Sequence, residues 1–483
     1  PQAAAAGYAA LLSYAELQEA PGVQGTDAQS QWRDLHIDSS LRFATVFSDD
    51  PRANAVRVFA AEALFADGEL AAAIDAAAPV TQTAQDPELL RTAWTVTGHS
   101  QFERSAFAEA EIAYLELRAL GARSDAERIA LDERLAATIY KQAEVARDAG
   151  DATLAVQHFL RVGTTAPGTA AHPVADFDAA AVLMGAGDWA AALPLLSAFA
   201  DRHDGHPLGE QVEARLALSL EKTGRPAEAA AVYQRIADSE TNPAERRATL
   251  WHITELYSQA GNDDASASVL TTLAAAPGAS LDERMDAQAQ LVELARKQGD
   301  TSEELRWLTA QVEADRKAGE TRTDRSRALA ADASMALALP IVERYRDVTL
   351  TVPLKESLRE KKARLETALA ALNATAGYSV QSVTTHAGYL VAELYFDFSQ
   401  ALMNSERPPG LDELALEEYE LLLEEQAFPF EEKAIDIHRL NADRTADGIY
   451  DQWVKDSFTR LAQLLPVRYA KTEVSDGLIE RLD

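Results

Sequence analysis

A pattern of glycines, small residues and large apolar residues recurs at a fixed interval through the middle of the chain. Four glycines stand 37 residues apart, and a fifth follows after 38. A small residue stands seven positions before each of the four glycines, and another stands five positions after it. Four positions beyond this second small residue comes a large apolar or aromatic residue, which lies one helical turn further on and therefore on the same helix face. The glycines are Gly150, Gly187, Gly224, Gly261 and Gly299, the small residues are Ala143, Ala180, Ala217, Thr254, Ala155, Ala192, Ala229 and Ser266, and the large ones are Phe159, Leu196, Tyr233 and Leu270.

This period predicts a series of helix hairpins. A glycine tolerates the positive φ that ends one helix, and a polar neighbour such as Asp151 or Asp188 can cap the next helix. The small residues would allow the two helices to touch, and the large ones would fill the space between neighbouring hairpins. We therefore expect an all-α fold with a period of about 37 residues, in which hairpins begin near residues 133, 170, 207 and 244.

Two further units lie outside the strict period and carry a family resemblance. One has three aromatics, a glycine and an alanine in a single stretch, and the other follows the turn-forming Asp50-Pro51. Their residues are Trp94, Gly98, Phe107, Ala110 and Tyr114 in the first, and Ala61, Leu64, Gly68 and Ala73 in the second. With them, residues 40–315 hold seven units, and the chain resembles the tetratricopeptide repeat (TPR) family. The resemblance implies a right-handed α-solenoid, although the family's period is 34 residues and Glu304 replaces the alanine expected in the last unit.

The period is lost after about residue 318. Long helical patterns follow over residues 353–376, 381–404 and 410–426, the last with leucines among many acidic residues. We expect two domains: a TPR-like solenoid over residues 1–318 and a helical C-terminal module over residues 319–483. A solenoid needs a cap over its last apolar face, so the module is interpreted as a cap or as an interaction module.

Charge and composition exclude several classes of function. The net charge of −32 argues against a nucleic-acid partner, because phosphate binding needs clustered lysine and arginine, and it disfavours an anionic membrane surface. No run of about 18 apolar residues is present, so no membrane span is expected. The absence of cysteine excludes disulfides and thiolate chemistry, and no cofactor is predicted.

The expected location is the periplasm, with the cytoplasm as the alternative. The chain begins at Pro1 without an initiator methionine, which indicates either a removed targeting segment or a trimmed chain. The C-terminal part, with aromatics beside acids at 393–399, 419–433 and 448–454, resembles that of large TPR proteins of the Gram-negative envelope. This resemblance implies protein partners among inner-membrane motor components of the TonB/ExbB/ExbD or gliding type, or outer-membrane transport components.

Catalytic and metal-binding patterns are weak. His203 and His206 form the one close histidine pair, for which we expect an incidental or structural role. Asp443 to Asp451 has calcium-loop spacing, with Asp443, Thr445, Asp447, Gly448 and Asp451 at ligand or turn positions, but Val454 replaces the bidentate glutamate, so a capped turn is favoured. No phosphate loop or nucleophile motif occurs. We predict no enzyme; the alternative is an active site around His386, His438 and Asp443.

The first helices of the hairpins supply candidate binding residues. Tyr140, Phe177 and Trp251 occupy one repeat position, with Ala214 between them, and could form an aromatic ladder along a concave groove. Further candidates near that groove are His99, Phe102, Glu144, Arg147, Met184, Leu218 and Glu255. Alternatively, the rings pack inside and Asp176 and Glu213 face outward.

We predict a non-catalytic protein-interaction scaffold that binds through this groove or the C-terminal module. An acidic groove favours basic or neutral partners. A structural subunit stacked in a larger envelope or motor complex is the alternative.

Overall fold

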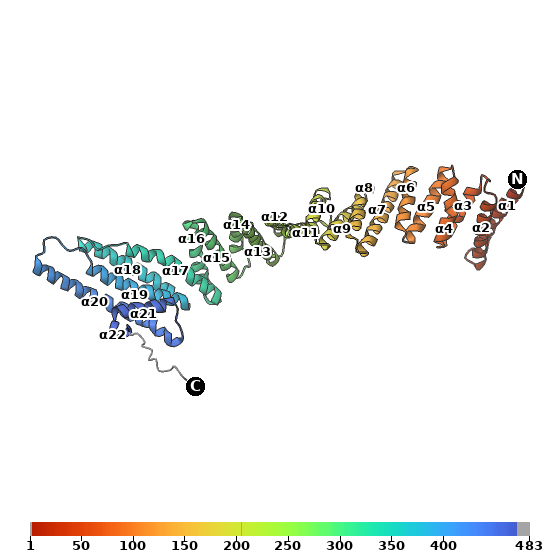
Figure 1. Ribbon diagram of the computed structural model, residues 1–483. Helices are drawn as coiled ribbons and strands as arrows, with labels where there is room; N and C mark the ends of the chain where they lie inside the picture. Colours follow the sequence, from red (N-terminus) through yellow and green to blue (C-terminus); the bar gives the residue numbers. More distant parts are fainter. Residues whose placement is uncertain (1, 204, 471–483) are drawn as a thin grey trace, which may run out of the picture. The chain divides into compact units, whose positions relative to one another are not determined.

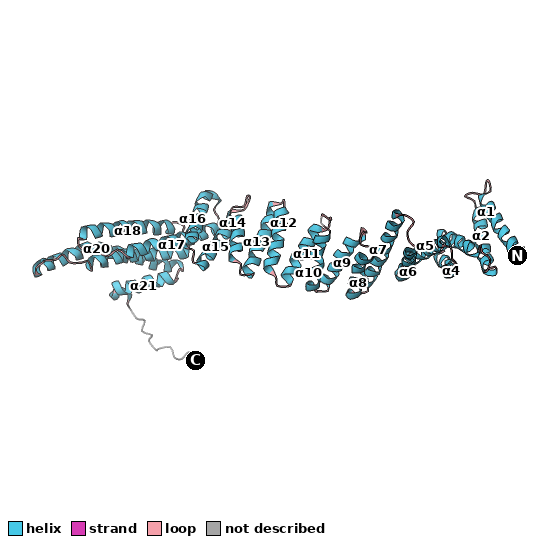
Figure 2. Ribbon diagram, turned by 90° about the horizontal axis from the view of Figure 1, so that it is seen from above, coloured by secondary structure: helices cyan, strands magenta, loops and turns pink. Residues whose placement is uncertain are grey.

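A computed structural model describes residues 2–203 and 205–470, and within these ranges the chain forms helices joined by turns, with no strand (Figure 2). The predicted all-α fold is confirmed. Two compact units divide the chain, Pro1–Ile236 and Ala237–Asp483, and the division falls inside α12 (Pro226–Ser239). The boundary expected after residue 318 stays a prediction. None of the described helices is both long enough and apolar enough to cross a membrane.

Within the first unit, helices adjacent in the chain pack against each other from α1 to α11 (Figure 1). Their bounds are α1 Gln2–Glu19, α2 Asp27–Val46, α3 Ala53–Ala66, α4 Leu70–Thr83, α5 Pro87–Glu103, α6 Phe107–Ala119, α7 Asp125–Asp148, α8 Ala152–Thr165, α9 Ala171–Gly185, α10 Trp189–Arg202 and α11 Gly209–Lys222.

The second unit contains two more hairpins and then longer helices. Its helices are α13 Pro243–Gln259, α14 Asp263–Ala274, α15 Leu281–Gln298, α16 Thr301–Ala318, α17 Asp324–Arg346, α18 Leu354–Ala376, α19 Gln381–Met403, α20 Glu413–Asp443, α21 Gln452–Leu464 and α22 Pro466–Tyr469, with short 3₁₀ turns at Gly319–Thr321 and Arg444–Asp447. The helices expected over 353–376 and 381–404 are confirmed as α18 and α19.

The helix expected over 410–426 is longer than predicted. It continues as α20 through Pro429 to Asp443. Proline removes one backbone donor from the helix, but Pro429 lies on the exposed side, where water can satisfy the carbonyl that loses its partner.

The repeat glycines form the turns inside the hairpins. All five adopt positive φ, between 68° and 82°, a conformation that side chains with Cβ rarely adopt. Hairpins begin at residues 171, 209 and 243, close to the predicted 170, 207 and 244. The exception is α7, which begins at Asp125 instead of residue 133 because the Ser124 hydroxyl caps it by accepting from the Glu127 N–H.

The small repeat residues lie at the helix contacts as predicted. All eight are at most 4% exposed, and six of them, the alanines, have no exposed surface. Phe159, Leu196 and Leu270 are also buried, whereas Tyr233 is half-buried. The unit around Trp94 uses its glycine for close approach: a Cβ at Gly98 would lie 2.6 Å from the Tyr114 ring. Small side chains thus set the distance between the paired helices.

Enlarging one of these contacts should destabilise the first unit. We expect Ala192→Leu to lower the free energy of unfolding by about 1–3 kcal/mol, because the added atoms have no space between packed helices. Ala200→Leu, at an exposed position of the same helix, is the matched control and should change stability by less than about 0.5 kcal/mol. Urea unfolding measures both; equal stability of the two variants would show that Ala192 is not at a tight contact.

Candidate interaction surfaces

The predicted aromatic ladder links neighbouring hairpins. The Tyr140 hydroxyl donates to the Asp178 carboxylate, and its ring packs on Phe159 with 5.1 Å between centroids. Burial, together with this hydrogen bond, raises the pKa of the Tyr140 phenol. Phe177 is 8% exposed, and the Arg215 guanidinium lies 3.8 Å from its ring centroid. Both rings are therefore already engaged by residues of the next hairpin's first helix.

The alternative prediction, in which the rings pack inside and Asp176 faces outward, is wrong for Asp176 on α9. It placed Asp176 on the outside, but Asp176 is buried at 6% exposure. It contacts His172 on its own helix and His203 at the end of α10. Because Phe177 is buried as well, consecutive positions of α9 both face inward: one towards α10, the other towards Arg215 of α11.

Two of the other groove candidates, Phe102 and His99, contact neighbouring aromatic rings. Phe102 packs inside its own hairpin, 5.3 Å from Phe107 between ring centroids. His99 lies between Phe65 and Tyr114, and burial lowers the pKa of its imidazole. The side chains of Met184, Leu218 and Trp251 are half-buried. Whether these residues bind a partner stays a prediction.

The charged groove candidates make local ion pairs. Glu144 lies 2.6 Å from Lys141 Nζ, and Arg147 Nε lies 3.1 Å from Asp148. Glu255 is exposed and 3.6 Å from His252. Arg147 also borders a hollow of about 500 Å³, lined by Asp178, Val182 and other residues of α9. Ion pairs at partly or fully exposed positions contribute little to stability.

The three residues of the alternative active site in the second unit lie in different surroundings. His386 stacks on Trp453 with 3.6 Å between centroids and lines a hollow of about 520 Å³. His438 has no exposed surface, and Asp443 ends α20. No hydrogen bond or ion pair among residues 2–203 and 205–470 joins these three side chains to one another.

His438 belongs to a buried polar network instead. Its Nε2 lies 3.2 Å from the Glu393 carboxylate, and Arg460 makes two hydrogen bonds to the same carboxylate, at 2.8 and 2.6 Å. Burial alone would raise the pKa of Glu393, but these two cationic or donor groups outweigh it and lower the pKa to about 2. The network joins α19, α20 and α21.

The calcium-like segment forms the favoured capped turn. Residues 444–447 are a 3₁₀ turn, and Gly448 adopts φ 78°. The Asp451 carboxylate accepts from the backbone N–H groups of Trp453 and Val454, and from the Thr385 hydroxyl at 2.6 Å. Asp451 is thus committed to capping α21 and to holding it against α19.

The outer face of α20 carries an exposed apolar stripe that the sequence analysis did not separate from the core face. Leu414, Leu421 and Phe428 are seven residues apart and 75%, 67% and 57% exposed. Residues on the opposite face, including Leu423 and Ala427, are buried. Seven residues are close to two helical turns, so the three exposed side chains lie in one row along the helix. We call this row the α20 stripe.

Glutamates line both sides of the α20 stripe. They occur three and four positions after each apolar member, at Glu417, Glu418, Glu424, Glu425, Glu431 and Glu432. Within the part of the chain that the structure describes, no lysine or arginine forms an ion pair with these six. The whole helix holds ten acidic against two basic residues. The result is a narrow apolar row between two negatively charged borders.

The sequence contained the signal for this surface. The run Leu421-Leu422-Leu423 reads as one apolar block, but only Leu423 is buried. The seven-residue spacing of Leu414, Leu421 and Phe428, combined with the paired glutamates, separates the outer row from the inner one. Such a heptad spacing is typical of helices that pair with another helix.

Comparisons with known proteins place the chain in no family. No family model matches the chain, and no curated protein matches it. Its fold aligns with the structure of Naa15/Naa10 bound to HypK-THB (TM-score 0.30, 15% identity, 96% of this chain and 64% of that chain), so it spans less than two thirds of that protein.

Two smaller TPR structures also align. One is YrrB, described as a TPR protein with an unusual peptide-binding site (TM-score 0.24, 14% identity, 42% of this chain and 94% of that chain). The other is a TPR protein from Parabacteroides merdae (TM-score 0.24, 11% identity, 57% of this chain and 97% of that chain). Because all three scores are low, function has to be inferred from the chain's own surfaces.

Proposed function

We propose that this chain is a protein-interaction scaffold whose α20 stripe binds a basic amphipathic helix of a protein partner. The single observation that carries the proposal is the row Leu414, Leu421 and Phe428, each more than half exposed, between two rows of glutamates that lack ion-pair partners in the described residues. Large side chains exposed in a row leave apolar surface in water, and a helix laid along them would bury it.

Charge selects the kind of partner. A second copy of α20 would bring acidic rows together, and like charges in close contact are unfavourable. A helix with leucines every seven residues and lysine or arginine on either side would pair with the glutamates while its leucines cover the stripe. The apolar contacts would supply affinity and the charges would speed association at low salt.

The setting proposed for this interaction is the cell envelope, and the role proposed is non-catalytic. The envelope assignment rests on the resemblance of the C-terminal part to envelope TPR proteins, and cell fractionation tests it. The non-catalytic role is supported by the complete burial of His438, one of the three residues of the alternative active site.

A synthetic peptide with these features tests the binding surface. The probe is a three-heptad helix with leucine at the contact positions and lysine or arginine beside them; a matched peptide with glutamate in place of the basic residues is its control. We expect the basic peptide to bind one per chain, and Phe428→Ala to weaken it about 30-fold, the equivalent of about 2 kcal/mol for an exposed aromatic anchor.

Control variants distinguish the α20 stripe from other surfaces. Ile112→Ala removes a side chain of similar exposure, 59%, from α6 and should leave affinity unchanged. Trp251→Ala tests the predicted groove. Fluorescence anisotropy across a salt series gives the affinities. Equal affinity for the basic and the acidic peptide would contradict the α20 stripe as the binding surface. So would a result in which Trp251→Ala loses binding while Phe428→Ala keeps the affinity of the native chain.

A further inference from the structure

Two histidines and an aspartate converge in the first unit, whereas the α20 stripe belongs to the second. His172 and Asp176 lie one helical turn apart on α9, and His203 directly follows α10. The Asp176 Oδ2 atom is 3.3 Å from His172 Nε2 and 3.4 Å from His203 Nε2. One ligand atom from each residue lies within 4.8 Å of the other two. All three side chains are largely buried, with 13%, 7% and 12% exposure.

The hydrogen bonding of His172 directs a lone pair at the carboxylate. Its Nδ1 lies 2.9 Å from the Pro167 carbonyl oxygen, which can only accept. Nδ1 therefore carries the proton, and in the neutral ring Nε2 presents a lone pair. This lone pair faces the carboxylate oxygen, an arrangement that is repulsive unless a proton or a metal ion lies between them. A backbone carbonyl that orients an imidazole in this way is common behind metal-binding histidines.

The rings are held in place before any ion arrives. A Cβ at Gly163 would lie 2.4 Å from His172 Nε2, so only glycine on α8 leaves space for this ring. The His203 ring packs against Phe199 at 4.8 Å and against the His172 ring at 5.0 Å between centroids. Arg202 also contacts the carboxylate: its Nη1 lies 3.4 Å from Asp176 Oδ2, and its side chain is 58% exposed. Its guanidinium can move into water when a metal ion takes its place beside the buried Asp176 carboxylate.

We propose that His172, Asp176 and His203 bind one divalent transition-metal ion of the zinc class. Metal–ligand distances of about 2.0–2.2 Å at a tetrahedral angle separate neighbouring ligand atoms by about 3.3–3.6 Å. The two separations around Asp176 already fall in this range. Imidazole and carboxylate ligands suit zinc, whereas calcium and magnesium prefer oxygen alone. The three ligands leave a fourth position for water or for a side chain of a partner.

The ligand set differs from the histidine pair visible in the sequence. His206 follows His203 by three residues, but its Nδ1 accepts a hydrogen bond from the Leu208 N–H at 3.2 Å, and its ring contacts Phe199. The partners of His203 lie 27 and 31 residues earlier in the chain. A bound ion would join the ends of α9 and α10 beside α8 and would stabilise this part of the first unit.

Metal binding to the full chain, without a histidine tag and after chelator treatment, tests the site. Cobalt(II) is the spectroscopic probe and zinc(II) the calorimetric one, both in the presence of excess calcium to occupy surface carboxylates. We expect one equivalent to bind, visible-range absorption of tetrahedral cobalt, and an increase in melting temperature with zinc. Absence of stoichiometric binding, or displacement of zinc by calcium, would overturn the proposal without any variant.

Variants then assign the ligands. His172→Ala, Asp176→Asn and His203→Ala should each weaken zinc binding at least tenfold, and His172→Ala combined with His203→Ala should abolish the cobalt spectrum. His206→Ala removes the neighbouring histidine and should leave both unchanged. Far-UV circular dichroism checks the fold. Retained binding in a folded double variant would overturn the assignment, and because Asp176→Asn preserves shape, it tests the site even if an alanine variant unfolds.

Discussion

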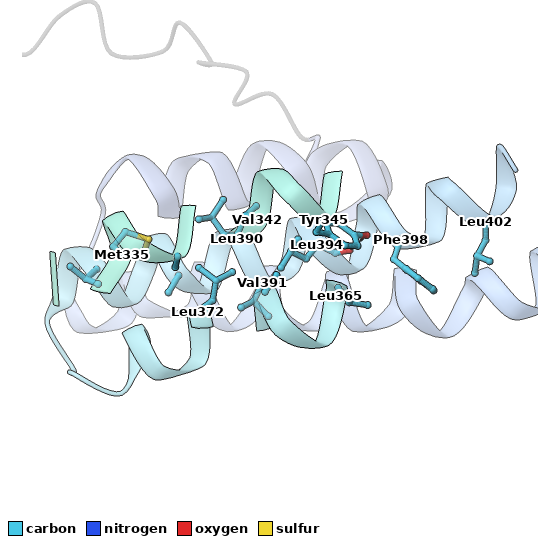
Figure 3. Close-up of a cluster of buried hydrophobic side chains, with 14 of the residues drawn as sticks. Met335, Val342, Tyr345, Leu365, Leu372, Leu390, Val391, Leu394, Phe398 and Leu402 are labelled. Atoms are coloured by element: carbon cyan, nitrogen blue, oxygen red, sulfur yellow. Dashed lines mark hydrogen bonds between the residues drawn. The ribbon is translucent and has the colours of Figure 1, made fainter. Parts of the chain in front are cut away.

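Replacing Phe398 by alanine is expected to lower the free energy of unfolding by about 3–5 kcal/mol, the range typical of a large aromatic removed from a core. Phe398 is fully buried in the cluster formed by α17, α18, α19 and α20 (Figure 3). Its ring centroid lies 4.6 Å from that of Phe430. Neighbouring side chains such as Leu394 and Leu402 belong to rigid helices and cannot collapse fully into the space left behind.

Phe428→Ala is the matched control for this change. Phe428 is on the next helix and 57% exposed, so its removal should alter stability by less than about 0.5 kcal/mol. Urea unfolding gives the free energies, and hydrogen exchange of α19 amides locates the effect in the second unit. If both variants were equally stable, Phe398 would not lie in a close-packed core. The pair also separates stability from binding, because only Phe428 belongs to the α20 stripe.

The second large effect is expected at Glu393, where Glu393→Gln should destabilise the second unit by about 3–5 kcal/mol at neutral pH. This change keeps the side-chain shape but removes the charge shared by Arg460 and His438. His438 has no exposed surface, and Arg460 is 25% exposed, so neither group can easily exchange the carboxylate for water. Glu425→Gln, an exposed change on α20, is the control and should be nearly neutral.

The effect of Glu393→Gln should depend on pH in a defined direction. The pKa of Glu393 is lowered from 4.5 to about 2 in the folded chain by His438 and Arg460, against the opposing effect of burial. A lowered pKa adds stability that is fully present above pH 4.5 and is lost as the pH falls towards about 2. The stability difference between the native chain and Glu393→Gln should therefore shrink across this window. A difference that stays constant from pH 7 to pH 3 would contradict the ion-pair explanation.

The hairpins could be predicted because their determinants are local. Gly187, for example, must end one helix at positive φ wherever the hairpin packs, and Ala180 and Ala192 stand seven residues before it and five residues after it, one on each helix of the hairpin. The early start of α7 was missed for an equally local reason. The period points to residue 133, but the cap at Ser124 lies before it and extends the helix.

The candidate binding residues were harder to predict, because exposure depends on what packs against a face. Tyr140 and Phe177 occupy a repeat position, and the sequence alone does not show that Asp178 and Arg215 of the next hairpin engage them. Leu421 and Leu423 are chemically identical neighbours. Only the placement of α19 against one side of α20 makes Leu423 core and Leu421 surface.

By itself, the sequence determined the all-α fold, the hairpin turns and the small residues at helix contacts, because each follows from backbone conformation and spacing within about 40 residues. The tertiary structure alone decided which polar groups meet. Packing of α9 against α10 brings His203 to Asp176, and packing of α19 against α20 and α21 brings Glu393 to His438 and Arg460. These side chains lie far apart in the chain, and the distance between them depends on how the helices pack, which the repeat period does not specify.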